Sequence, residues 1–198
     1  MLLVYLLRHG ETTYNAAGNR YCGLTDAPLT AKGLSQAEQV AGRLREVKLD
    51  GVYASPLQRS FRTAGIASGG SMPVLMDNRL IEVDFGTWEG KTREEFIAEN
   101  PSLWEAWNNG PEQVKAGGTG DTGLDVVTRV DHFFREMYWK HAGGTILVTA
   151  HNGVNRLYLA HKLGMPLKYY RRLVQENSAV TLFELSEAGE LSLLKMNA

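Results

Sequence analysis

The chain has 198 residues, and its 43% hydrophobic and 22% charged content is that of an ordinary globular domain, which excludes a disordered segment and a coiled coil. A single domain over residues 1–198 is expected. The formal net charge of -1 supplies no overall positive field, so we expect no binding to nucleic acid or to a membrane. The only cysteine, Cys22, excludes an intramolecular disulfide and a cysteine-based zinc site, and fits a cytoplasmic location.

The first part of the chain alternates short apolar runs with stretches of helical spacing. Residues 2–7 and 51–55 are short and apolar, which predicts buried strands. One helix is predicted to begin near Thr30 as its N-cap, and a second at Pro56, after Ser55 as cap. In the second helix, the predicted inward face consists of Leu57, Phe61 and Ala64, and another side carries Arg59, Arg62 and Thr63.

An irregular segment then interrupts the alternation. Residues 85–120 contain only short helical pieces, which predicts a small helical cap inserted into the domain, or a lid. Its three tryptophans, Trp88, Trp104 and Trp107, are expected to form a satellite core, because large aromatic side chains usually bury area first. The glycine-rich stretch 117–123 is the expected mobile joint of the cap.

The last part of the chain resumes the regular pattern. A long helix is predicted over residues 124–140 and a buried strand over 145–150. The order of elements predicts an α/β fold, in which a three-layer α/β/α sandwich surrounds a mostly parallel sheet and carries the cap insertion. The remaining predicted elements are a helix that follows Gly153 and ends before Gly164, and the segments 180–185 and 190–196, which form a hairpin or edge strands.

Polar side chains follow three of the predicted strands. Arg8 and His9 come directly after the first strand, Arg59 follows the second, and His151 with Asn152 follows the third. Taken singly, each has an ordinary explanation as a strand end, a core histidine or a surface charge. Because ligands bind at the carboxyl ends of strands in an open parallel sheet, we expect the side chains to meet in one positive crevice. A phosphate group is therefore the expected ligand.

The residue types suit phosphoryl chemistry. The planar fork of an arginine matches phosphate oxygens, and the backbone N–H groups of Gly10 and Glu11 with the amide of Asn15 are expected to complete an anion cradle. Nearby arginines disfavour a protonated imidazole, so His9 is expected to remain neutral and act as the nucleophile.

A phosphoryl transfer also needs an acid that protonates the leaving oxygen. Glu82 is the best candidate, because its neighbours are apolar and such a setting tends to raise the pKa of a carboxyl group. Asp84 and Glu89 are competitors, and spacing alone does not separate the three.

Four segments together resemble the histidine phosphatase superfamily, also called phosphoglycerate mutase-like, over about residues 3–156. They are residues 7–12 with Asn15, residues 55–64, residues 82–90 and residues 148–153. The segment Phe85-Gly86-Thr87-Trp88-Glu89-Gly90 resembles the phosphatase branch. The resemblance implies a phosphohistidine at His9, a phosphate held by Arg8, Arg59, His151 and Asn15, and Glu82 as the proton donor.

This sequence departs from the family pattern at three places. Residues 120–123 read Gly-Asp-Thr-Gly where relatives often carry Gly-Glu-Ser, and Cys22 stands where a glutamine is frequent. Asn152 replaces a common glycine, and it is expected to donate to the phosphate or to narrow the pocket. We expect Gly23 and Asn152 to bind substrate together with Asn15.

The expected function is that of a phosphomonoesterase that acts on a small phosphorylated metabolite. No metal or cofactor is expected, since the histidines lack metal-ligand spacing. The chain is expected to be a monomer or a homodimer. Two alternatives stay open: a phosphoglycerate mutase, which returns the phosphoryl group to the same substrate, and an inactive module that only binds phosphate esters.

Overall fold

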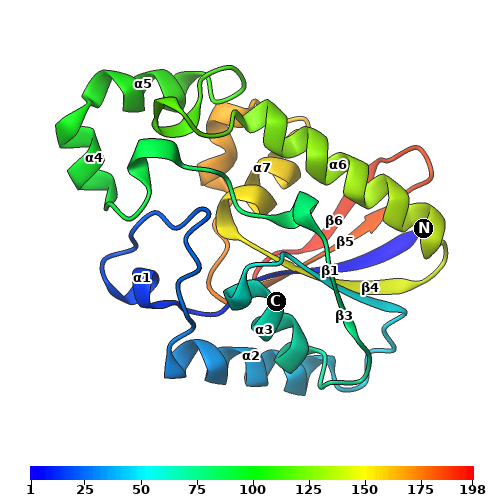
Figure 1. The fold of residues 1–198 in the computed structure, drawn as a ribbon. Coiled ribbons are helices and arrows are strands. Elements are labelled where there is room, and N and C mark those ends of the chain that lie inside the picture. The colour runs from blue at the N-terminus through cyan, green and yellow to red at the C-terminus, as the bar shows by residue number, and fades with distance from the viewer.

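Six strands form one sheet in the order β3-β2-β4-β1-β5-β6 (Figure 1). In this computed structural model, which describes residues 1–198, β1, β2, β3 and β4 are parallel, whereas β5 is antiparallel to β1 and to β6. The predicted mostly parallel sheet is therefore confirmed. The strands are β1 (Leu2–Arg8), β2 (Gly51–Ala54), β3 (Val74–Met76), β4 (Thr145–Ala150), β5 (Val180–Leu185) and β6 (Leu191–Lys195).

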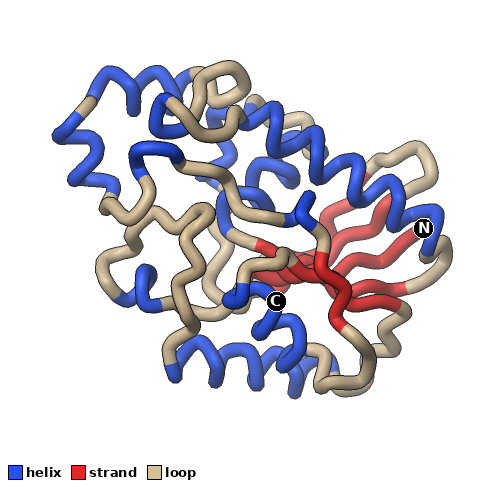
Figure 2. Tube along the Cα trace, in the orientation of Figure 1, coloured by secondary structure: helices blue, strands red, loops and turns tan.

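Helices cover both faces of the sheet, as the predicted three-layer sandwich requires (Figures 1 and 2). Helices α2 and α3 lie on one face and α6 and α7 on the other. Strand β1 contributes to both cores, because Leu6 joins the cluster under α6 and α7, and Leu7 joins the cluster under α2 and α3. The helices are α1 (Thr13–Ala16), α2 (Ala31–Leu44), α3 (Gln58–Ala67), α4 (Arg93–Glu99), α5 (Pro101–Asn109), α6 (Gly123–Lys140) and α7 (Asn152–Lys162), with short 3-10 turns at Asn78–Leu80, Gly86–Trp88, Ala116–Gly118 and Leu167–Arg172.

The parallel register brings the ends of β1 and β4 together. Arg8 lies opposite Ala150, and the N–H of His9 donates to the carbonyl of Ala150 at 3.1 Å. Since β2 also runs parallel to β4, the residues that follow these three strands emerge at one edge of the sheet.

Helix caps set the start of the long helices. The hydroxyl of Thr30 accepts a hydrogen bond from the N–H of Gly33, which confirms Thr30 as the N-cap of α2. Helix α6 begins with a capping box between Thr122 and Asp125. These local signals explain why the beginnings of α2 and α6 agree with the sequence pattern to within a residue.

Helix α3 differs from its prediction in both start and orientation. It begins at Gln58, two residues after Pro56, and its N-cap residue Leu57 makes no side-chain cap. Phe61 is 37% exposed, whereas Arg59 and Thr63 are fully buried. The predicted inward face is therefore wrong for Phe61, whereas Ala64 is buried as predicted. The polar face turns inward because its side chains find hydrogen-bond partners there: Thr63 bonds to Gly10, and Arg59 to the loop before α2.

The segment 85–120 forms a helical cap in which α4 and α5 project from the sandwich (Figure 1). Its tryptophans are buried as predicted, and Trp88 stacks on Phe96 with ring centroids 4.6 Å apart. The expected mobile joint is instead tightly packed, since a Cβ atom on Gly117 would lie 2.1 Å from the carbonyl oxygen of Phe85. The positive φ of 58° at Gly117 also requires glycine.

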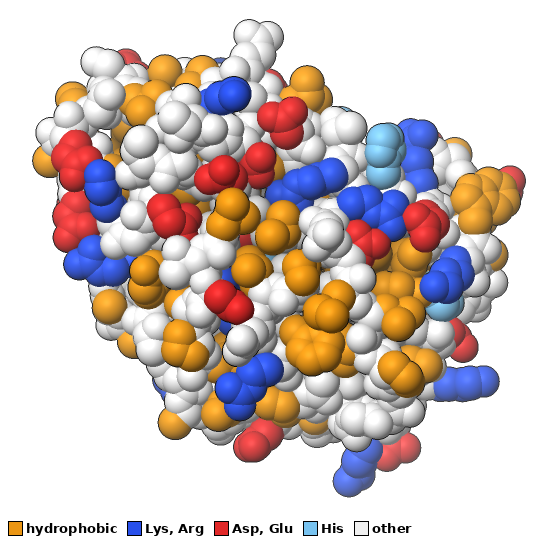
Figure 3. Space-filling model, viewed as in Figure 1, with side chains coloured by type: hydrophobic (Ala, Val, Ile, Leu, Met, Phe, Trp, Pro, Cys, Tyr) orange, Lys and Arg blue, Asp and Glu red, His pale blue; other side chains and the backbone are white.

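The C-terminal segments form the predicted hairpin, but only β6 is an edge strand, because β5 pairs with both β1 and β6. Strand β3, at the opposite edge, was not predicted. No helix has the length and apolar character needed to cross a membrane. On the face drawn in Figure 3, positive and negative side chains are interspersed rather than gathered by sign.

Candidate active site

A cavity of about 480 Å³ opens at the carboxyl ends of the central strands. It brings together most of the residues that the sequence predicted, from segments far apart in the chain. Its walls also contain residues that were not predicted. The lining residues include Arg8, His9, Asn15, Glu82 and Asn152 among the predicted set, and Thr12, Asn19, Arg20, Tyr21, Cys22, Phe85, Gly153, Arg156, Tyr170, Val174, Gln175, Glu176 and Asn177 besides.

His9 lies at the end of β1 with one ring nitrogen occupied. Its Nδ1 lies 2.7 Å from the carbonyl oxygen of Gly10, which can only accept, so Nδ1 carries the proton. In the neutral ring, the lone pair is then on Nε2. Burial, followed by the positive charges of Arg59 and Arg8, holds the pKa of His9 well below its ordinary value of 6.5. His9 is thus a neutral imidazole with Nε2 available as a nucleophile.

His151 follows β4, and its ring centroid lies 5.2 Å from that of His9. Its Nδ1 accepts a hydrogen bond from Nε of Arg59 at 3.2 Å, which places the proton of the neutral ring on Nε2. Burial and the charge of Arg59 hold the pKa of His151 well below its ordinary value. The Nε2 atom is buried and has no partner within the protein. His151 does not line the cavity itself, but its ring lies beside His9, which does, so its Nε2–H is a donor without a partner next to the cavity.

Arg59 lies behind the cavity and does not line it. Besides His151, its guanidinium donates to the carbonyl oxygens of Thr25 at 2.6 Å, Gly23 at 2.8 Å and Cys22 at 3.2 Å. These bonds fix the loop before α2. In this structure Arg59 orients His151 and places positive charge near both histidines, and its expected direct contact with a phosphate stays a prediction.

Arg8 lines the cavity and lies near His9, whose pKa its charge helps to lower. Its Nη1 donates to the backbone carbonyl of Gln175 at 2.7 Å, while its Nε is buried without a partner. Burial, followed by the charge of Arg156, lowers the pKa of Arg8 to about 10. The group remains cationic at neutral pH and retains donors for phosphate oxygens.

Asn15 lines the cavity with its side-chain oxygen occupied, which leaves its amide nitrogen as the free donor. That oxygen accepts from the N–H of Thr12 at 3.0 Å and from Nδ2 of Asn177 at 3.2 Å. The expected backbone cradle is absent, however. The N–H of Gly10 donates to Oγ1 of Thr63, and that of Glu11 donates to Oε1 of Gln36, so neither is free for an anion.

Glu82 is the only one of the three candidate acids that lines the cavity. Its Oε2 accepts from the N–H of Gly153, and its Oε1 accepts from the N–H groups of Val83 and Val154, each at 2.9 Å. The carboxyl group therefore lies among backbone amides at the start of α7, not in the apolar setting that its neighbours predict. The close approach requires glycine at 153, since a Cβ there would lie 2.7 Å from Oε1 of Glu82.

The two competing carboxylates have structural partners. Oδ1 of Asp84 accepts from the N–H of Gly86, and both carboxylate oxygens of Glu89 accept from the N–H of Gly23. These bonds hold turns of the backbone together outside the cavity. Geometry thus separates Glu82 from its neighbours, which spacing could not do.

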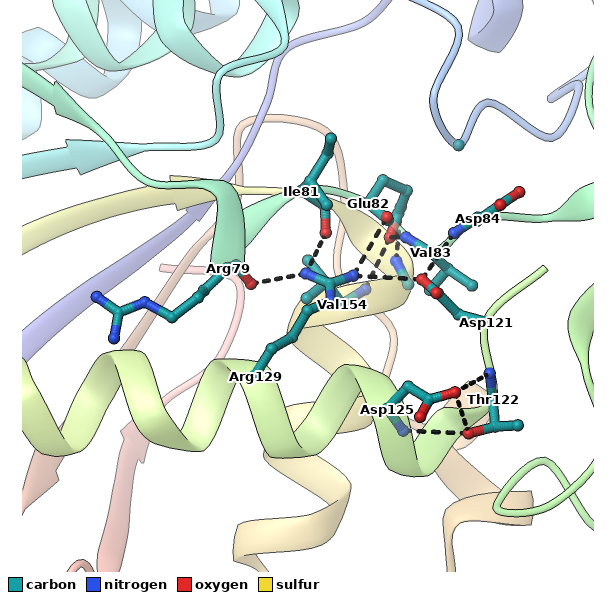
Figure 4. Close-up of polar contacts among 12 residues, drawn as sticks. Arg79, Ile81, Glu82, Val83, Asp84, Asp121, Thr122, Asp125, Arg129 and Val154 are labelled. Atoms are coloured by element: carbon teal, nitrogen blue, oxygen red, sulfur yellow. Dashed lines mark hydrogen bonds and ion pairs between the residues drawn. The ribbon is translucent and has the colours of Figure 1, made fainter.

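Arg129, on α6, holds the segment that carries Glu82 (Figure 4). Its Nη1 donates to the carbonyl oxygens of Arg79 at 2.6 Å and Ile81 at 2.7 Å, and its Nη2 donates to the carbonyl of Glu82 at 3.2 Å. Nη2 also lies 3.6 Å from Oδ2 of Asp121. Segment 120–123, which departs from the family pattern, therefore contacts the site indirectly, because its Asp121 lies beside Arg129.

The remaining predicted positions divide into two groups. Asn152 lines the cavity, whereas Gly23 does not. The N–H of Gly23 is taken by Glu89, and a Cβ at Gly23 would lie 2.4 Å from the carbonyl of Val83, so Gly23 is closely packed and its N–H is not free for a substrate. Cys22 lines the cavity with its thiol donating to the carbonyl of Thr25, and burial raises its pKa.

Two parts of the cavity were missed by the sequence reasoning. The loop before β5 contributes Gln175, Glu176 and Asn177, and α7 contributes Arg156 one turn after Asn152. The spacing of Asn152 and Arg156 by four residues is a signal for a shared helix face that the sequence contained. The loop before β5 carries no such signal. No group of three or more His, Cys, Asp or Glu side chains is arranged to hold a metal ion.

Comparison with known proteins agrees with this geometry. A family model described as the histidine phosphatase superfamily (branch 1) matches residues 4–198. The chain belongs to this superfamily. Phosphoserine phosphatase 1 of Hydrogenobacter thermophilus is 32% identical over 198 residues, which cover 100% of this chain and 92% of that protein. A probable phosphoglycerate mutase, GpmB, of Enterobacter sp. (strain 638) is 32% identical over 193 residues, 97% of this chain and 89% of that protein.

Solved structures give the same result for this superfamily member. A mutant phosphoserine phosphatase of Entamoeba histolytica in complex with phosphoserine superposes with a TM-score of 0.90 at 27% identity, covering 100% of this chain and 98% of that one. The resemblance read from the sequence motifs is thus confirmed. Together with the named phosphatases among its relatives, it assigns the chain to the phosphoric monoester hydrolases.

Proposed function

We propose that the chain hydrolyses a small phosphorylated metabolite without a metal ion, through a phosphohistidine at His9. The observation that carries the proposal is the hydrogen bond from Nδ1 of His9 to the Gly10 carbonyl, which leaves Nε2 of a neutral ring as the reactive atom. The single cysteine favours a cytoplasmic setting for this activity.

In the first step, Nε2 of His9 attacks phosphorus in line, the N–P bond forms and the bond to the ester oxygen breaks. Donors from Arg8, Asn15 and Nε2 of His151 stabilise the charge on the equatorial oxygens. Glu82 gives its proton to the leaving oxygen. Its Oε2 accepts one backbone hydrogen bond and Oε1 accepts two, so Oε2 has the free lone pair that can carry this proton.

In the second step, a water molecule attacks phosphorus and the N–P bond breaks. The carboxylate of Glu82 takes a proton from that water, which restores the acid for the next cycle. Inorganic phosphate leaves and His9 returns to its neutral form. Atoms and charges balance over the two steps without a further reactant.

The test is a quench of the purified chain during turnover of a labelled phosphate monoester, with a chelator present. We expect an acid-labile, base-stable phosphoryl group on the parent protein and none on His9→Ala, whose thermal unfolding should remain cooperative. Turnover by His9→Ala, or turnover by the parent that stops with the chelator, contradicts the proposal.

The similarity to a probable phosphoglycerate mutase favours one second candidate, which shares the first step. A mutase returns the phosphoryl group from His9 to another hydroxyl of the substrate, whereas a phosphatase transfers it to water. Measuring phosphate release alongside interconversion of 3- and 2-phosphoglycerate separates the two. Conversion that outruns release identifies a mutase, and phosphate binding without either reaction identifies an inactive binding module.

A further inference from the structure

Arg156 lines the cavity but has no role in the phosphoryl chemistry described above. It lies on α7, where its Nε donates to the carbonyl oxygen of Asn152 at 3.0 Å. Its two Nη groups make no hydrogen bond within the protein. Burial lowers the pKa of Arg156, yet no carboxylate approaches within ion-pair distance to compensate its charge.

Other charged groups in the cavity have hydrogen-bond or ion-pair partners within the protein. Arg20 forms an ion pair with Glu95 through both Nη groups, at 2.9 and 3.2 Å, and also donates to the carbonyl of Gly90. Glu82 is held by three backbone N–H groups. Arg8 and Arg156 are therefore the guanidinium groups left for a ligand, and Arg8 is already required by the phosphate.

The charge of Arg156 acts on Arg8 and is not among the charges that lower the pKa of His9 or of His151. Arg8 and Arg59 are the arginines whose charges depress the pKa of His9. The guanidinium carbon of Arg156 lies 5.3 Å from the ring centroid of Tyr170, which also lines the cavity. Stacking on an aromatic ring fixes the plane of a guanidinium and directs its remaining donors.

Aromatic side chains complete this end of the cavity. Tyr21 and Phe85 line it and contact each other edge to face with centroids 4.7 Å apart. Arg156 is thus a cation in a partly apolar compartment beside the phosphate site. A compartment of this kind suits a small anionic group attached to a short carbon chain.

We propose that Arg156 binds a carboxylate of the substrate, so that the chain selects phosphate monoesters that carry a carboxylate a few bonds from the phosphate. One guanidinium fork matches one carboxylate in shape and charge. A second phosphate group would set two negative charges against that single cation, in a cavity that Glu176 also lines. The inference rests on the proposed phosphatase function and specifies its substrate class.

The test uses two esters that differ only at the group in question. In 3-phosphoglycerate a carboxylate occupies the position that a hydroxymethyl group occupies in glycerol 3-phosphate. We expect the parent protein to have the higher kcat/KM for 3-phosphoglycerate. Arg156→Gln should lower that value roughly 10- to 100-fold while changing the value for glycerol 3-phosphate about twofold or less, because only the carboxylate loses a charge-assisted bond.

Two variants serve as controls. Arg156→Lys keeps the charge but loses the fork, so it should retain part of the preference. Arg171→Gln removes another guanidinium that stacks on Tyr170, at 4.5 Å, but does not line the cavity. It should leave the ratio of the two kcat/KM values unchanged. Equal losses on both esters in Arg156→Gln would overturn the proposal, since they would mean that Arg156 holds the phosphoryl group or the fold.

Equilibrium binding separates this inference from the hydrolytic function. In His9→Ala, we expect tighter calorimetric binding of 3-phosphoglycerate than of glycerol 3-phosphate, and loss of that difference when Arg156→Gln is added. Such a result supports the carboxylate site even if no ester is hydrolysed. Equal affinity of the two esters for His9→Ala overturns it even if both are hydrolysed by the parent.

Discussion

Nε of Arg59 donates a hydrogen bond to Nδ1 of His151 at 3.2 Å, and this bond determines which nitrogen of His151 carries the proton. A histidine whose Nδ1 accepts must carry its proton on Nε2 when neutral. The same guanidinium binds the carbonyl oxygens of residues 22, 23 and 25. One buried side chain therefore couples the tautomer of a site histidine to the position of a loop.

Replacing Arg59 should consequently impair both stability and catalysis. Arg59→Ala leaves three carbonyl oxygens and Nδ1 of His151 without their donor, and we expect a loss of about 3 kcal/mol in unfolding free energy. Arg59→Lys keeps the charge but not the fork, and kcat/KM should fall roughly 100-fold. Urea titrations and steady-state kinetics measure the two effects.

The matched control for Arg59 is Arg62, on the exposed side of the same helix. Arg62→Ala and Arg62→Lys should change neither the urea midpoint nor kcat/KM appreciably. If Arg59→Lys left kcat/KM as unchanged as Arg62→Lys does, the hydrogen bond between Arg59 and His151 would not contribute to catalysis.

Glu82→Gln tests the proton donor through its dependence on the leaving group. An amide cannot supply the proton, so kcat/KM for an alkyl phosphate should fall by about 10²- to 10⁴-fold. An aryl phosphate with an acidic phenol as leaving group needs little protonation and should lose far less. The amide NH₂ would also face backbone donors at Gly153 or Val154, so thermal unfolding must be followed in parallel.

Equal losses on alkyl and aryl esters would point to a structural role for Glu82. Glu89→Gln is the matched control. Its carboxylate is hydrogen bonded outside the cavity, so any loss of activity should be the same for both kinds of ester.

Arg129 is predicted to act as a positioning residue for Glu82. Arg129→Gln removes donors to the carbonyls of residues 79, 81 and 82, so the Glu82 segment should be held less firmly. We expect kcat for an alkyl phosphate to fall roughly tenfold with little change in KM, and the aryl phosphate to be less affected. Arg135→Gln, on the same helix in an exposed ion pair, should leave kcat unchanged.

The sequence predicted the site residues that follow strands and missed those that act through the backbone. Arg8, His9 and His151 lie where parallel strands end, and that position follows from the apolar runs before them. Arg129 instead binds backbone carbonyl oxygens, which every residue has, so no pattern in the sequence indicates which residues it contacts. Arg156 shares a helix face with Asn152, but only the folded cavity shows that this face has an opening.

Helix α3 explains the main error in the fold. The prediction assumed that the apolar side of a helix faces the core, and it therefore placed Phe61 inside and put Arg59 and Thr63 on another side of the helix. A buried polar face is stable only where each group finds a partner, and those partners come from residues 10 and 22–25, which are distant in sequence. Hydrogen bonds between residues so distant in sequence can be identified only in the folded chain.

The two site histidines should make the ligand-free protein less stable in mild acid. Both pKa values lie well below 6.5 in the folded state, because burial and nearby arginines disfavour the imidazolium. Below pH 6.5 the unfolded chain therefore binds protons that the folded chain does not, and stability falls as the pH falls. At pH 5.5 the expected loss is up to about 1.4 kcal/mol for each histidine.

Urea midpoints at pH 7.5 and 5.5, in buffer without phosphate, measure this loss. His151→Gln should reduce it by about half, whereas His132→Gln, which removes an exposed imidazole on α6, should leave it as in the parent. His141, whose pKa burial also lowers, contributes a background common to all three proteins. Carboxylates with lowered pKa values, such as Asp77, lose their stabilisation only in more acidic solution, outside this range. An unchanged loss in His151→Gln would mean that its imidazole is protonated in the folded protein, which is incompatible with an acceptor Nδ1 facing Arg59.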